Sequence, residues 1–143
     1  MTRLGIIFSL LFATPAWAGE VDGNSFICKD KKGTAGIALS FRGGMAELFG
    51  RANNILQYEV FYDTVIIGKI CTQCSMYRMD RKSLNLQHET LWDLDMARAM
   101  GHATNRTINS KYGCEFMDFS KAKKLVAEAL AKEKLEREKD YKF

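Results

Sequence analysis

Apolar and polar residues alternate in short segments along most of the chain after residue 24. Ile37, Leu39 and Phe41 alternate with small or polar residues, a pattern typical of a strand with one buried face. Turn-forming residues separate this segment from similar ones on either side. About six to seven such strands with short connections predict a mainly β (α+β) fold: an antiparallel meander, a small barrel or a sandwich.

Residues 90–101 fit two patterns. Thr90 and Asp93 imitate a capping box, and apolar residues then recur at helical spacing. Alternation at even-numbered positions would also suit a strand. We expect a helix or helical turn here, a loop over residues 101–111, and a last short strand over residues 112–117.

The C-terminal residues 121–143 predict an amphipathic helix. Ser120 can cap a helix that begins at Lys121. The sequence beyond Leu135 is almost entirely charged. We therefore expect the first half to pack on the sheet or on a partner chain, with self-association through residues 121–143 as one alternative. The apolar face consists of Ala122, Leu125, Val126, Ala129 and Leu130.

The first 18 residues have the three-part pattern of a secretory signal. Arg3 precedes an apolar run of about ten residues, and small residues flank Trp17. A spanning helix needs about 20 apolar residues, so we expect cleavage rather than a membrane span. The protein would then be periplasmic or secreted, of bacterial type. Three parts follow: a cleaved signal peptide (1–18), a disulfide-stabilised β-rich domain (19–120) and a charged helix (121–143).

Charge is evenly balanced over most of the chain. Residues 19–120 carry 12 basic and 12 acidic side chains, and residues 121–143 carry 8 and 5. The mature chain therefore has a net charge of +3 (20 basic minus 17 acidic), located in the tail. Because a basic field over the whole domain is lacking, we expect no nucleic-acid partner.

The four cysteines are Cys28, Cys71, Cys74 and Cys114. An exported chain with an even number of cysteines is expected to form disulfides. We favour Cys28–Cys114 with Cys71–Cys74, since the close pair needs only a turn to meet. The long link would stabilise the fold by about 4 to 5 kcal/mol. Crossed pairings stay open, because connectivity cannot be read from sequence.

The Cys71-Thr72-Gln73-Cys74 spacing has two functional readings. A redox pair needs a thiolate of lowered pKa, commonly at a helix N-terminus, yet strand-like segments flank this pair. A structural zinc site usually has two such motifs, and the chain has one. We expect a covalent clip on a turn, with no metal, no cofactor and no catalytic residue.

Histidine and aromatic residues supply the remaining candidates. His88 lies on the apolar phase of its strand, which favours a structural role, and His102 follows a glycine in a loop. Asp93 and Asp95 are expected on a solvated surface. Aromatic residues on strands can line a ligand cavity or a protein contact surface. The candidate binding residues are Tyr58, Phe61, Tyr62 and Tyr77.

The segment YRMDRKSLNL resembles a hairpin of uncharacterised small secreted β proteins of bacteria and phages. The matching residues are Tyr77, Met79, Asp80, Arg81, Ser83, Leu84 and Cys114. The resemblance covers about a third of the mature chain and implies a small β domain without a known active site.

Taken together, these patterns predict an exported, non-catalytic protein that binds a protein or a small ligand. A thiol–disulfide protein using Cys71 and Cys74 is the first alternative. The second is an assembly component that pairs through residues 121–143.

Overall fold

Alternating strands close into an antiparallel barrel. The structure is a computed structural model and describes residues 21–101 and 104–141. The predicted signal peptide (1–18) and His102 lie outside these residues. Eight strands of the described part pair in chain order, and β8 closes the ring against β1. They are β1 (Ser25–Lys29), β2 (Ala35–Arg42), β3 (Met45–Gly50), β4 (Asn54–Phe61), β5 (Thr64–Ile67), β6 (Ser75–Asp80), β7 (Asn85–Leu91) and β8 (Arg106–Phe116).

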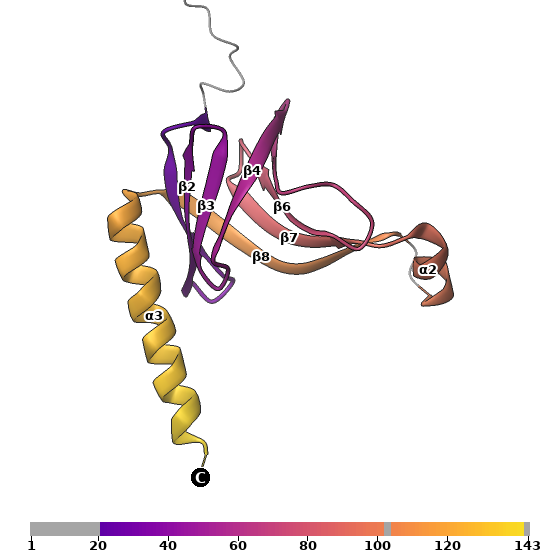
Figure 1. Cartoon of the computed structure of the whole chain (residues 1–143). Coiled ribbons are helices and arrows are strands. Elements are labelled where there is room, and N and C mark those ends of the chain that lie inside the picture. Colours follow the sequence, from indigo (N-terminus) through magenta and orange to yellow (C-terminus); the bar gives the residue numbers. More distant parts are fainter. Residues whose placement is uncertain (1–20, 102–103, 142–143) are drawn as a thin grey trace, which may run out of the picture.

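The predicted mainly β class is confirmed, and among the predicted architectures it is the barrel that forms (Figure 1), with eight strands in the described part rather than the six to seven expected. Ile37, Leu39 and Phe41 lie in the barrel core, each at most 1% exposed. The alternate residue Ala38 faces outward and packs under the C-terminal helix. The alternation predicted one buried face for β2, and the strand has two, because the C-terminal helix covers its outer face.

Helix α3 (Phe119–Lys139) packs outside β1, β2 and β3. Ala122 and Val126 are fully buried there, which confirms that the first half of the tail helix packs on the sheet. The expected cap at Ser120 is wrong, because Asp118 accepts a hydrogen bond from Lys121 N at 3.2 Å and the helix begins earlier. Gly50 permits the close approach, since a Cβ there would lie 2.5 Å from Val126 Cγ1.

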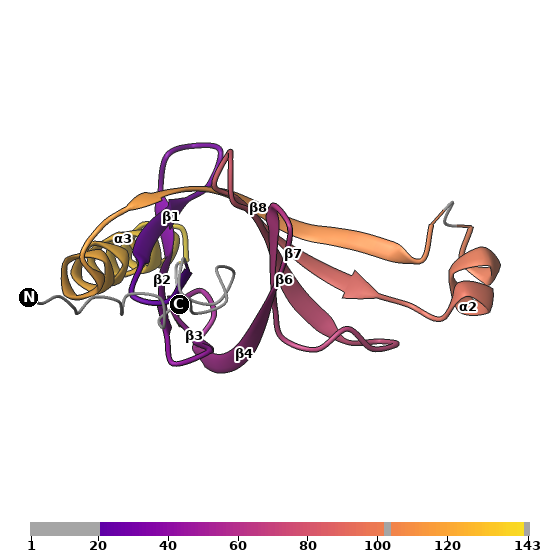
Figure 2. The ribbon, with the colours of Figure 1, turned by 90° about the horizontal axis from the view of Figure 1, so that it is seen from above.

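Strands β7 and β8 continue beyond the ring as a ribbon, which we call the arm (residues 89–108). Figure 2 shows this ribbon leaving the ring of strands and ending at α2. Helix α2 (Leu94–Ala99) is capped by Asp93, whose carboxylate accepts hydrogen bonds from two backbone N–H groups. A helix near residues 90–101 therefore forms, but the capping pair at Thr90 and Asp93 is wrong, since Thr90 still belongs to β7.

Strand β8 begins earlier than predicted, and left-handed residues end β4 and β5. The expected loop over residues 101–111 is wrong from Arg106 onward, because β8 begins there. Its polar residues pair with β7, and this pairing outweighs their low strand propensity. Strand β5 ends at Ile67, since Gly68 has a φ of 102° and turns the chain. Tyr62 similarly follows β4 with a φ of 55°.

Candidate functional site

The two disulfides join the pairs favoured from the sequence. Cys28 and Cys114 are directly opposite on β1 and β8, with Cα atoms 4.0 Å apart. This bond lies in the barrel core and spans 86 residues of sequence. It therefore fixes the first strand to the last at the closure of the barrel.

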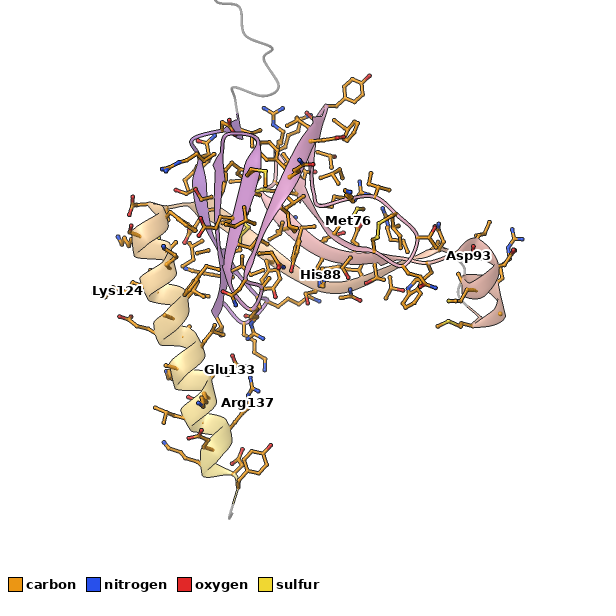
Figure 3. All side chains as sticks on the ribbon, in the orientation of Figure 1. Met76, His88, Asp93, Lys124, Glu133 and Arg137 are labelled. Carbon is orange, nitrogen blue, oxygen red and sulfur yellow. A yellow bond between two sulfur atoms is a disulfide. The ribbon has the colours of Figure 1, made fainter. Side chains whose placement is uncertain are left out.

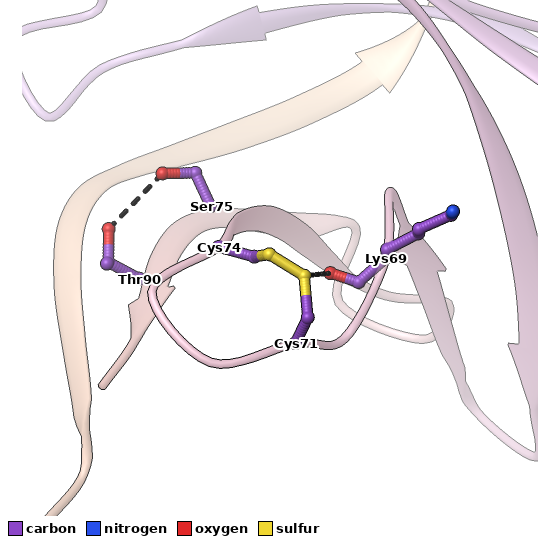
Figure 4. Close-up of a disulfide and its surroundings, with 5 residues drawn as sticks. All are labelled: Lys69, Cys71, Cys74, Ser75 and Thr90. Atoms are coloured by element: carbon purple, nitrogen blue, oxygen red, sulfur yellow. Dashed lines mark hydrogen bonds between the residues drawn. A yellow bond between two sulfur atoms is a disulfide. The ribbon is translucent and has the colours of Figure 1, made fainter. Parts of the chain in front are cut away.

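The Cys71–Cys74 disulfide closes the turn between β5 and β6 (Figure 4). Gln73 N donates to Leu91 O, and Leu91 N donates to Cys74 O at 3.0 Å, so the turn is tied to the end of β7. The pair leads into strand β6 and does not stand at a helix N-terminus. The arrangement lacks the helix end that commonly lowers a thiol pKa in redox pairs and fits the expected clip.

The four candidate aromatic residues do not form one surface. Tyr58 and Tyr77 point into the barrel core and are 9% and 7% exposed. Phe61 and Tyr62 lie at the β4–β5 turn and are 47% and 94% exposed. The Tyr58 hydroxyl donates to Asp22, and burial together with this carboxylate raises the pKa of Tyr58.

A groove of about 1080 Å³ lies at the end of the barrel where the β1–β2 turn meets β8. We call it the mouth groove. Helix α3 continues past the strands on this side, and Figure 3 places Glu133 on that portion. The lining comprises residues 30–35, Arg51, residues 108–112, Ala129, Lys132, Glu133 and Glu136.

An inner pocket of about 340 Å³ adjoins the mouth groove and shares Arg51, Ser110 and Tyr112 with it. Tyr77 and His88 line its floor, with rings stacked at a centroid distance of 4.6 Å. Burial lowers the pKa of His88. The pKa of Tyr77 is raised, mainly by burial and to a smaller extent by the nearby Tyr112. Both rings are thereby held in their neutral forms and can exchange hydrogen bonds with a ligand.

Lysine charges around the mouth groove lack carboxylate partners. Glu133 is bonded to Arg137 and Arg51, each at 2.9 Å, and these contacts lower its pKa. Asp30 accepts hydrogen bonds from the backbone of its own turn. The groove lining has five basic and three acidic side chains, with Glu136 among the acidic ones, so its charge is slightly positive. In the described part of the chain no ion pair involves the remaining basic groups. These groups are Lys31, Lys32, Lys111 and Lys132.

Protonation of His88 is expected to destabilise the fold. Because burial lowers its pKa, the unfolded chain binds the proton at a higher pH than the folded chain does. Stability should be fully present above a pH of about 6.5 and decline as the pH falls through the folded pKa. The variant His88→Phe keeps a stacking ring but has no titrating group at this position. Its free energy of unfolding, measured in urea at pH 7.5 and 5, should therefore fall less between the two pH values than that of the parent protein. An NMR titration midpoint of His88 at or above about 6.5 would contradict the prediction.

Of the pocket residues the sequence predicted only Tyr77 as a binding residue, whereas His88 was expected to have a structural role. Arg51 carries no sequence signal for a site, and Lys111 falls in the expected loop over residues 101–111. The approach of β8 to the β1–β2 turn is a tertiary feature. Gly36 carried a usable signal: it interrupts a strand pattern, and a Cβ there would lie 2.9 Å from the Tyr112 ring. A glycine in a strand often marks such a close approach.

The fold and site define a disulfide-closed β-barrel with a groove at one end. Comparisons with protein-family models, curated proteins and solved structures give no match. The resemblance at residues 77–84 therefore stays a prediction. No helix in the described part of the chain has the length and apolar character needed to cross a membrane.

Proposed function

We propose that this chain is a non-catalytic binding protein of the periplasm or cell exterior, and that its ligand is an anion held in the mouth groove. The supporting observation is the set of lysines around the groove that have no carboxylate partners, together with Arg51 at the entrance of the inner pocket. Both cysteine pairs are bonded, which suits an oxidising compartment.

The inner pocket supports binding of a ligand that also carries a flat group. Tyr77, His88 and Tyr112 supply ring edges and polar atoms around a volume of about 340 Å³. Pockets that combine aromatic walls with a few convergent polar groups are typical of ligand sites. Arg51 lines both pocket and groove, and its guanidinium is bonded to Glu133 at 2.9 Å, so a ligand anion would share this cation with that carboxylate.

Binding of 8-anilinonaphthalene-1-sulfonate to the mature chain tests this function. We expect saturable one-site binding, and weaker binding of N-phenyl-1-naphthylamine, which has the rings without the sulfonate. In the double variant Lys111→Gln/Lys132→Gln the sulfonate affinity should fall about thirtyfold, since each nearby charge contributes about 1 kcal/mol in water and about 1.4 kcal/mol is a factor of ten. The neutral dye should be unaffected by these substitutions.

The matched control is Lys134→Gln/Lys139→Gln, which changes net charge equally on exposed residues outside the groove. It should leave both affinities within about twofold, because these exposed side chains do not line the groove and their charges are screened by solvent and salt. Absence of saturable sulfonate binding, or an equal loss in the two double variants, would contradict the proposed site.

A further inference from the structure

One edge of β8 has no neighbouring strand along half its length. Strand β7 pairs with residues 106–113 of β8, whereas β1 pairs only from Gly113 to Phe116. Among the described residues, no second strand pairs with residues 107–112 and no loop backbone bonds to them. This stretch is an exposed strand edge within an otherwise closed barrel.

The backbone groups that face this open edge follow from the alternation of a strand. Cys114 N donates to the carbonyl just before β7 at 2.9 Å, so Cys114 faces β7 and Lys111 faces away. At the other end of β8 the Arg106 carbonyl and N–H form hydrogen bonds with the Thr104 hydroxyl, on the side away from β7. The backbone of Ile108, two residues further on, faces the same side. Ile108 and Lys111 are three residues apart, so strict alternation would turn them to opposite sides. The register shift between β7 and β8 adds one residue to this stretch and lets both face the open edge.

The open edge borders the mouth groove. Ile108 is 42% exposed and lines the groove together with Lys111. Lys31 and Lys32 of the β1–β2 turn and Lys132 of α3 line it as well. A chain lying along this edge would therefore run through a groove with a small excess of positive charge, with Ile108 as an apolar contact.

We propose that the occupant is an extended segment of a partner protein that adds a strand to β8 and carries acidic side chains. Backbone groups of Ile108 and Lys111 would pair with it, and Lys111 and Lys132 would face its carboxylates. Backbone pairing gives affinity in strand addition, and side chains give specificity. A second copy fits less well, because it would bring two lysine-bordered edges together. This inference rests on the proposed function and names its partner class.

The test uses the full mature chain labelled with ¹⁵N and a synthetic probe, acetyl-Thr-Glu-Val-Glu-Val-Glu-Thr-amide. The matched probe has proline in place of both valines, so it keeps the charge and loses two backbone N–H donors. We expect the first peptide to slow amide exchange at Ile108 and Lys111 at least about tenfold and to bind about tenfold more tightly than the proline peptide. The variant Lys111→Gln/Lys132→Gln should weaken both peptides.

The other outcomes overturn the inference and are separable from the proposed function. Equal affinity of the two peptides, or no binding at about 5 mM while the naphthalene sulfonate binds, would show an anion groove without strand addition. Amide protection that depends on protein concentration and not on peptide would show pairing between copies. Failure of both the peptide and the sulfonate to bind would remove the inference and the proposed function together.

Discussion

Replacing Cys28 and Cys114 together with alanine is expected to lower the free energy of unfolding by about 4 kcal/mol. The bond closes a loop with a sequence separation of 86 residues, so it removes many conformations from the unfolded chain. It also lies in the barrel core, where Cys28 is fully buried. Urea denaturation at pH 7 measures the loss from the shift of the midpoint at constant slope.

The second disulfide provides the control. In the same chain-entropy description, the double variant Cys71→Ser/Cys74→Ser should lose about 2 kcal/mol or less, since the bond closes a loop of only a few residues. This clip is also partly exposed at the edge of the arm, so serine can be solvated there. Equal losses in the two double variants would show that closure between β1 and β8 is not what stabilises the barrel.

The position of Cys28–Cys114 links stability to the mouth groove. Pairing of β1 with β8 ends at Lys29 and Gly113, one residue beyond the bonded cysteines. The open edge of β8 begins at that point. The disulfide thus stops the two strands from separating further, and it fixes the width of the groove between Lys111 and the β1–β2 turn.

The strands of the barrel wall were largely readable from alternation. The period of two in β2 and in β4 is strong because one face of each strand contacts a single apolar core. The missed half of β8 has no such signal, since Ile108, Asn109 and Lys111 lie in the open ribbon and its groove, where both faces meet solvent. Its strand structure comes from pairing with β7 rather than from burial.

The candidate site was less predictable than the fold. Tyr58 and Tyr62 share a strand phase, yet Tyr62 leaves the strand in a left-handed turn and points to solvent. Tyr77 does reach the site, but its partners come from the far end of the chain and from the turn after β3. Barrel closure decides which residues meet at the mouth, and no local pattern encodes the closing pair of strands.

Replacing Arg78 with methionine is expected to destabilise the protein by about 3 kcal/mol at pH 7. Glu89 has no exposed surface, and Arg78 Nε lies 3.2 and 3.3 Å from its two carboxylate oxygens. The other basic group, Arg106 Nε, is 3.8 Å away and only weakly placed for a hydrogen bond. Removal of Arg78 leaves a buried carboxylate poorly compensated. The figure is at the low end for buried pairs because Arg78 is itself 34% exposed.

A double-mutant cycle with Glu89→Gln isolates this interaction. The single variant Glu89→Gln removes the charge but keeps a hydrogen-bonding group, so a loss of about 1 to 2 kcal/mol is expected. In the double variant the methionine no longer faces a buried carboxylate, and the total loss should be smaller than the sum of the single losses by about 1.5 kcal/mol or more. Urea denaturation of the four proteins measures this coupling. Additivity within about 0.5 kcal/mol would mean that the arm is held on the barrel by its strand pairing alone, without help from the buried ion pair.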